Sequence, residues 1–218
     1  MHIEFLVEDL STQILLENLV DKIIKNNHTW KIHSYKGIGR IPKNMRGIID
    51  PKKRILLDRL PKLLNGYGKT FFGYSDDYQA VVIIVTDLDK RNLKEYLLEL
   101  HDVLNNCSHK PDAEFCIAIE ESEAWLLGDI GAIKKAYKRA KQRILSAYVN
   151  DSICGTWEKL ADAIYLGGAL ELKKGGWQSV GKIKSEWAEK ITPFMDINKN
   201  KSDSFCYFRD TLKSIDKL

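Results

Sequence analysis

The chain has 218 residues, 44% of them hydrophobic and 29% charged, with a net charge of +4, which suits one large soluble domain and is too mild to establish a polyanionic partner. Its four cysteines form no C-x-x-C pair, which argues against a zinc site or a set of disulfides and favours reduced thiols in a cytoplasmic protein. No apolar run approaches the roughly 20 residues of a membrane helix, and the start of the chain is too acidic for a signal peptide, so no membrane association is expected.

Hydrophobic periodicity predicts alternating strands and helices in the first 130 residues. In chain order, the expected elements are a strand at 2–7, a helix at 10–27, a strand at 30–35, a helix at 51–69, a strand at 79–86, a helix at 92–106, a strand at 113–119 and a helix at 121–129. This order implies an α/β fold with a mostly parallel sheet and helices on both faces. Pro61 lies within the second helical pattern, where it either kinks that helix or opens a new one.

From about residue 131 onward the pattern is helical and contains no persuasive strand. We therefore divide the chain into an α/β domain at 1–130 and a helical C-terminal extension at 131–218 that packs on it. Neither part contains a repeat or a low-complexity segment.

Local sequence signals predict where helices end and begin near the end of the chain. Pro193 is expected to end one helix, and Ser202 or Asp203 to cap the last one. Phe205 and Phe208 recur at helical spacing in this last helix. We expect them to anchor it to the rest of the domain.

Acidic residues follow three of the four expected strands. They are Glu8 and Asp9 after the first strand, Asp87 and Asp89 after the third, and Glu120, Glu121 and Glu123 after the fourth. Parallel sheets bind ligands at the carboxyl ends of their strands, and clustered carboxylates repel unless they are protonated or hold a cation. Oxygen ligands suit Mg²⁺ or Mn²⁺, so the pattern predicts a divalent metal site. The alternative is that each acid caps the helix after its strand.

Basic residues form a second group of candidates. Segment 132–144 reads as one amphipathic helix whose basic half suits a phosphate backbone, although a plain solvated surface is the alternative. The basic residues on that half are Lys134, Lys135, Lys138, Arg139 and Lys141. The glycine loop GIGR at 37–40, which contains Arg40, could cradle a phosphate or form an ordinary turn.

The sequence resembles a bacterial Toprim-like family of unknown function, related to the Toprim domains of topoisomerases and primases and to the overcoming-lysogenization-defect nucleases. The motifs that carry the resemblance are FLVEDLST (5–12), GIGR (37–40), VTDLD (85–89), IAIEESEAWLLGD (117–129) and KSDSFCYF (201–208). The resemblance implies a Rossmann-like sheet in which Glu8 is an acid/base or metal ligand and Asp87 and Asp89 bind metal. Asp9 stands where Toprim enzymes usually have glycine, and Thr12 stands where many have a further acid.

Together, the acids and the resemblance predict a nuclease, or a related phosphodiester-cleaving enzyme, that depends on Mg²⁺ or Mn²⁺. Its expected catalytic residues are Glu8, Asp87 and Asp89, and Glu121 and Glu123 are expected as further metal ligands. We expect DNA more than RNA as the substrate. Because members of this family are often encoded beside an ATPase, the resemblance also implies an ATPase partner in defence against foreign DNA.

Two other functions stay open. The first is a non-catalytic Toprim-like binding or regulatory subunit, which Asp9 and Thr12 favour because they depart from the Toprim pattern. The second is a phosphatase or nucleotide-processing enzyme of small substrates, which would use the same metal site.

Overall fold

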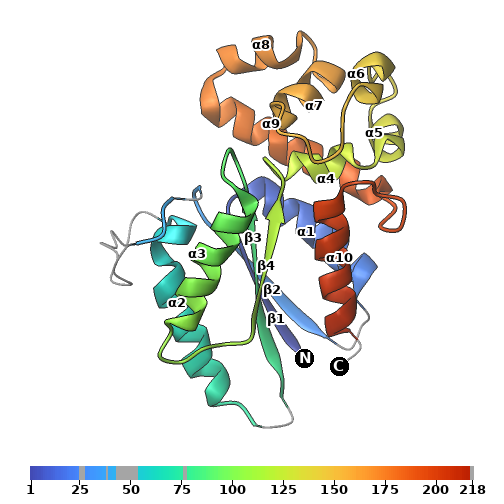
Figure 1. The fold of residues 1–218 in the computed structure, drawn as a ribbon. Helices are drawn as coiled ribbons and strands as arrows, with labels where there is room; N and C mark the ends of the chain where they lie inside the picture. Colours follow the sequence, from blue (N-terminus) through green and yellow to red (C-terminus); the bar gives the residue numbers. More distant parts are fainter. Residues whose placement is uncertain (25–27, 38, 43–53, 76–77, 217–218) are drawn as a thin grey trace.

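The computed structural model describes five stretches of the chain, residues 1–24, 28–37, 39–42, 54–75 and 78–216. Its elements in chain order are β1 (His2–Val7), α1 (Leu10–Ile23), β2 (Thr29–Ser34), α2 (Leu56–Phe72), β3 (Ala80–Asp87), α3 (Leu93–Asn105), β4 (Ala113–Ala118), α4 (Glu123–Leu127), α5 (Ile130–Ala136), α6 (Gln142–Ser146), α7 (Thr156–Ile164), α8 (Gly168–Lys174), α9 (Gly176–Ile191), the 3₁₀ turn η1 (Thr192–Phe194) and α10 (Asp203–Ile215). The alternation of strands and helices up to β4 confirms the predicted α/β class (Figure 1). The expected helix end at 25–27 and helix start at 51–53 lie outside the described residues.

The sheet has the strand order β2-β1-β3-β4, and every neighbouring pair is parallel. In this register Val7 of β1 lies opposite Val85 of β3, and Asp87 of β3 lies opposite Ala118 of β4. The carboxyl ends of β1, β3 and β4 are therefore side by side. These are the three strands that the sequence follows with acidic residues.

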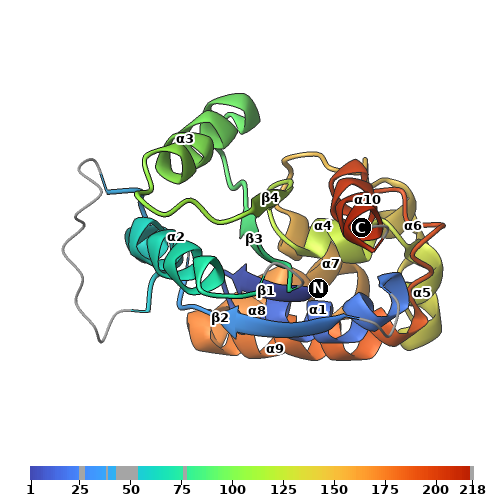
Figure 2. The same cartoon turned by 90° about the horizontal axis from the view of Figure 1, so that it is seen from below.

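Alternate side chains of each strand pack on opposite faces of the sheet. Phe5 and Ile83 belong to the hydrophobic core that includes α1 and α10, whereas Leu6 and Ile84 belong to the core that includes α2 and α3. Figures 1 and 2 show the same division, with α2 and α3 covering one face and α1 and α10 the other. The predicted cover of helices on both faces is thus confirmed.

Several helix boundaries follow from local chemistry. α1 begins where the Asp9 side chain accepts a hydrogen bond from the backbone N–H of Thr12 at 2.8 Å. α10 begins where the Ser202 hydroxyl accepts from the backbone N–H of Phe205 at 3.1 Å, which confirms one of the two predicted caps. α9 ends before Pro193, as expected from the missing N–H of proline.

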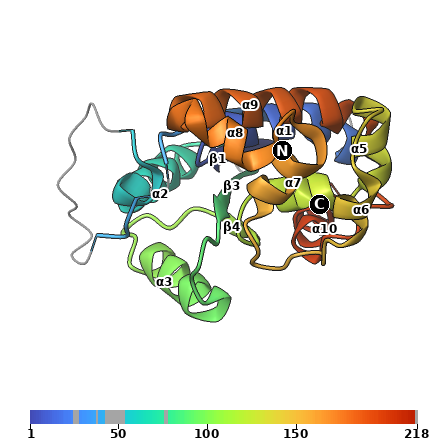
Figure 3. The ribbon, with the colours of Figure 1, turned by 90° about the horizontal axis from the view of Figure 1, so that it is seen from above.

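The helices from α4 to α9 gather beyond the carboxyl ends of the strands (Figures 1 and 3). α9 runs along α1, and α10 then returns to pack beside β4. The expected boundary at residue 130 stays a prediction, since the chain crosses back to the sheet at its end. Among the described residues, no helix combines the length and the apolar character that a bilayer crossing requires.

The prediction of a single basic helix over 132–144 is wrong. α5 stops at Ala136, and α6 starts only at Gln142. Tyr137 adopts an extended conformation (φ −124°, ψ 90°), and the backbone N–H of Lys141 donates to the carbonyl of Ala163 at 2.9 Å. In a continuous helix the N–H of Lys141 would donate to a carbonyl four residues earlier. Here it donates to the end of α7 instead.

Aromatic packing holds α10 against the rest of the molecule. Phe205 and Phe208 are completely buried, and the ring of Phe208 stacks on Trp125 of α4 at a centroid distance of 4.9 Å. The indole N–H of Trp125 donates to the Ser204 hydroxyl at 2.9 Å. This bond avoids the free-energy cost of burying the N–H without a hydrogen-bond partner. The expected anchoring of the last helix is confirmed.

The segment before α10 approaches α4 closely. The Asn200 side chain donates to the carbonyl of Trp125 at 2.7 Å, and the backbone N–H of Lys201 donates to the carbonyl of Gly128 at 2.9 Å. A side chain at position 128 would overlap the Asn200 carboxamide, so this approach requires glycine. Two of the motifs behind the Toprim resemblance, 117–129 and 201–208, therefore pack against each other.

We predict that Phe205→Ala lowers the free energy of unfolding by about 3–5 kcal/mol, because a fully buried phenylalanine leaves a cavity. Chemical denaturation followed by circular dichroism measures this change. Tyr207→Ala is the matched control on the same helix, since Tyr207 is about half exposed, and we expect it to change stability little. Wild-type stability in Phe205→Ala would show that α10 does not depend on this anchor.

Candidate active site

The structure brings together acidic side chains from three neighbouring strand ends. Glu8 directly follows β1, Asp87 is the last residue of β3, and the turn from β4 to α4 carries Glu121 and Glu123. Asp87 and Glu123 are buried, and Glu8 is half-buried. The backbone N–H of Asp87 donates to the Glu8 carboxylate at 3.3 Å, which fixes these two acids beside each other.

Asp89 lies on the turn beyond β3 and not on the strand itself. Its backbone is left-handed (φ 53°), and its N–H donates to the carbonyl of Glu120 at 2.9 Å. Left-handed backbone is uncommon for residues other than glycine and is concentrated at functional sites. The turn leaves the Asp89 residue exposed at the same edge of the sheet as the buried Asp87.

A lysine from the helical part enters this acidic group. The Nζ atom of Lys184 on α9 lies 3.0 Å from a carboxylate oxygen of Glu123 and 3.3 Å from one of Glu121. Burial opposes the positive charge of Lys184, but Glu123, Glu121, Asp87 and Asp9 together hold its pKa well above the ordinary value. Lys184 is therefore a permanent cation inside the site.

Lys184 was not among the predicted site residues, although the sequence carries a signal for it. Val180, Trp187 and Ile191 form the buried stripe of α9, and Lys184 stands on the same stripe at helical spacing. A lysine on the apolar face of an amphipathic helix needs a buried partner. The buried partners of Lys184 are Glu121 and Glu123 in the turn after β4, which is far away in the sequence. The pattern of α9 alone therefore does not predict which residues they are.

Burial raises the pKa of most acids in this group. It raises the pKa of Glu8 to about 7 and that of Glu121 to about 8, with repulsion by neighbouring acids adding to the effect. It raises the pKa of Asp87 well above its ordinary value, with the charge of Glu8 as the next cause. Burial also raises the pKa of Asp89, against the opposing charge of Arg91. A further cation would favour the ionised forms of all four acids.

The chemistry of these donors fits a hard divalent cation, because all of them are carboxylate oxygens. Within the described residues, however, no three His, Cys, Asp or Glu side chains are arranged as a ready metal-ligand group. The structure thus gathers the predicted acids and supplies Lys184 as a counter-ion. The Mg²⁺ or Mn²⁺ site stays a prediction.

Glu120 does not join these acids. Its carboxylate accepts hydrogen bonds from the backbone N–H groups of Cys154, Gly155 and Thr156 at 2.9–3.1 Å, and also from the Thr156 hydroxyl. Although burial acts in the opposite direction, these bonds lower its pKa. Glu120 therefore caps α7, which is the alternative that the sequence left open for each acid.

Asp9 also serves as a helix cap while its charge faces the site. Its carboxylate caps α1, and its negative charge raises the pKa of both Glu8 and Lys184. Thr12 is buried, and its hydroxyl donates to that of Ser122 at 3.3 Å. Thr12 thus connects the start of α1 to the turn after β4 and adds no charge there.

The basic candidates do not form one surface. The exposed basic residues in and between α5 and α6 include Lys134, Lys135, Lys138, Arg139 and Lys141. Arg40 is also exposed, but its backbone N–H donates to Asp58 in the first turn of α2 at 2.8 Å. Figures 1 and 3 place α2 on the opposite side of the molecule from α5 and α6. Ile38, in the same glycine loop as Arg40, lies outside the described residues.

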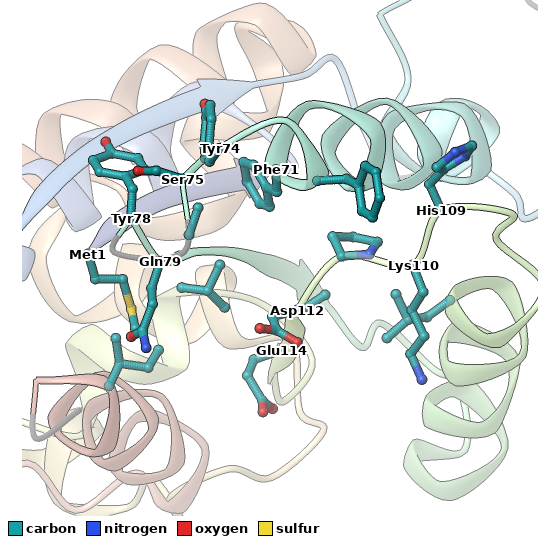
Figure 4. Close-up of a pocket in the computed structure, with 18 of the residues that line it drawn as sticks. Met1, Phe71, Tyr74, Ser75, Tyr78, Gln79, His109, Lys110, Asp112 and Glu114 are labelled. Atoms are coloured by element: carbon teal, nitrogen blue, oxygen red, sulfur yellow. The ribbon is translucent and has the colours of Figure 1, made fainter.

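A pocket of about 1080 Å³ lies at the other end of the sheet, where the strands begin (Figure 4). Its lining includes Phe71, Tyr74 and Tyr78 along one side and Asp112 and Glu114 beside the start of β4. Open parallel sheets bind ligands at the carboxyl ends of their strands, which is the opposite edge. We therefore assign the candidate active site to the acids and not to this pocket.

We predict that Glu120→Gln destabilises the protein by about 1.5–3 kcal/mol, the usual loss when a charged hydrogen-bond partner is removed. Urea denaturation monitored by tryptophan fluorescence measures this change. Glu114→Gln is the matched control, because Glu114 is an exposed carboxylate on β4. If both variants unfold at the same urea concentration as the wild type, the cap on α7 does not contribute to stability.

The raised pKa of Glu8 predicts a pH-dependent stability. The Glu8 carboxyl keeps a proton up to about pH 7 in the folded protein but loses it near pH 4.5 when unfolded, so the folded state binds more protons between these values. The free energy of unfolding therefore falls as the pH rises through this window. Glu8→Gln should weaken this dependence in melting curves recorded without divalent metal.

The matched control for that measurement is Glu189→Gln, which changes an exposed carboxyl on α9. We expect this variant to keep the wild-type slope of melting temperature against pH. An unchanged slope in Glu8→Gln would contradict the raised pKa of Glu8.

Comparisons with protein-family models, curated proteins and solved structures find no match to this chain. The Toprim resemblance therefore depends on the motifs alone. In the structure, the motif at 5–12 spans the end of β1 and the start of α1, and the motif at 85–89 spans the end of β3. These are the positions from which Glu8, Asp87 and Asp89 reach the edge of the sheet.

Proposed function

We propose that the protein is a phosphodiester-cleaving enzyme of the Toprim type that depends on Mg²⁺ or Mn²⁺, and that it acts as a nuclease on DNA more than on RNA. The main support is that Glu8, Asp87 and Asp89 lie at the ends of neighbouring parallel strands and have raised pKa values at one edge of the sheet. Ionisable groups perturbed in this way are concentrated at functional sites. A bound divalent ion would neutralise a phosphate and activate water.

Each site residue has a separate role in the proposed reaction. Asp87 and Asp89 supply carboxylate ligands from the end of β3 and from the turn after it. Glu8, with a pKa of about 7, suits the exchange of a proton at neutral pH, as an acid/base group requires. Lys184 keeps Glu121 and Glu123 in place from the side of α9.

Binding of the nucleic acid is assigned to exposed basic side chains beyond the acidic edge. Lys134, Lys138, Arg139 and Lys141 lie near α5 and α6, so they are candidates for contacts with backbone phosphates. Arg40 is a separate candidate beside α2. The ATPase partner and the role in defence against foreign DNA are proposed from the Toprim resemblance alone.

A cleavage assay tests the proposal directly. Labelled DNA and RNA are incubated with the full chain and Mn²⁺ or Mg²⁺, and the rate of cleavage is measured for the wild type and for Glu8→Gln and Asp87→Asn. We expect cleavage by the wild type and a loss of about 10²–10⁴-fold for Glu8→Gln, the usual contribution of an acid/base group. Glu114→Gln, on an exposed carboxylate of β4, should keep the wild-type rate.

Equal cleavage by the wild type and both site variants would place the activity elsewhere and contradict the proposal. A non-catalytic binding subunit is the second candidate, and the ion pairs of Lys184 with Glu121 and Glu123 favour it because they already balance part of the acidic charge. Calorimetric titration with Mn²⁺ separates the two functions. Binding that disappears in Asp87→Asn supports the enzyme, and no binding at millimolar Mn²⁺ supports the subunit.

A further inference from the structure

The acidic group has two parts that differ in their positive partners. Glu121 and Glu123 share the ammonium of Lys184, at 3.3 Å and 3.0 Å. Among the described residues, no Lys, Arg or His nitrogen forms an ion pair with the carboxylate of Glu8 or Asp87. The ion pairs of Lys184 are thus on the side of the turn after β4.

Lys184 cannot easily leave this position. Its side chain is only 13% exposed, and it stands between Val180 and Trp187 on the buried stripe of α9. α9 itself is packed along α1, the helix that follows Glu8. The backbone that carries the ammonium is therefore fixed by apolar burial on both sides.

The ammonium of Lys184 occupies the position between Glu121 and Glu123 that a metal ion bound to both would occupy. It also supplies positive charge there, as the metal ion would. A divalent ion bound to the same oxygens would meet Lys184 at a few ångströms, where two positive charges repel strongly in a buried setting. Removing Lys184 would leave two carboxylates that share no cation, which is the arrangement that binds a hard divalent ion.

We propose that Lys184 takes the place of a second divalent cation, so that the protein binds a single Mg²⁺ or Mn²⁺ ion, held by Asp87 and Asp89 beside Glu8. Glu121 and Glu123 are then partners of Lys184 and not metal ligands, which revises the ligand set expected from the sequence. This inference rests on the proposed metal-dependent function, and it concerns how many ions that site holds.

The test counts Mn²⁺ ions bound to the full chain by titration calorimetry, independently of any activity. We expect one ion per wild-type chain, and a loss of affinity of at least about 100-fold in Asp87→Asn, since even outer-shell changes cost 10–100-fold. Lys184→Met, which keeps the length of the side chain, should bind a second ion. Lys182→Met, on an exposed lysine of the same helix, should bind one.

A second arm does not depend on the folding of Lys184→Met. Glu121→Gln should bind its single ion with a dissociation constant within about threefold of the wild-type value, less than 1 kcal/mol. Three results would each contradict the role of Lys184: two ions in the wild type, a loss of binding in Glu121→Gln, or a folded Lys184→Met with one ion. None of these results would contradict the proposed metal-dependent enzyme. A wild type without Mn²⁺ and a Lys184→Met variant that binds one ion would instead support Lys184 and contradict the proposed enzyme. If no variant binds Mn²⁺, both proposals are wrong.

Discussion

Parallel pairing of β1, β3 and β4 is the constraint on which the rest of the structure depends. Because the three strands run in the same direction and in a matched register, the residues that follow them reach the same edge of the sheet. Glu8 and Asp87 meet there although they are 79 positions apart in the sequence. The acidic edge is therefore a consequence of the sheet topology, and its negative charge must be balanced by something that lies beyond the strands.

The buried acids differ in the direction in which their pKa values are shifted. Glu120 receives backbone hydrogen bonds from the start of α7 and has a lowered pKa, as expected for a carboxylate whose ionised form is stabilised. Glu8 and Asp87 have few such donors and raised pKa values. This contrast separates an acid whose ionised form is stabilised by hydrogen bonds from acids whose ionised forms are disfavoured by burial.

The helical part contributes Lys184 to the site and aromatic packing to the fold. Lys184 reaches the acids from α9, whereas Phe205 and Phe208 of α10 close the core around Trp125. Both helices come from the last part of the chain and return to the α/β layer. The edge of the sheet is thus completed by residues that follow the last strand by many positions.

The sequence by itself determined the order of strands and helices, the acids at the strand ends and the Ser202 cap, because each depends on periodicity or on neighbours within a few residues. Only the tertiary structure decided the turn of Glu120 away from the site, the break after Ala136 and the entry of Lys184. These features depend on contacts between distant residues: Glu120 with the start of α7, Lys141 with Ala163, and Lys184 with Glu121 and Glu123. A local pattern reports the preference of a segment, but it carries no information about which distant donor or charge will meet it.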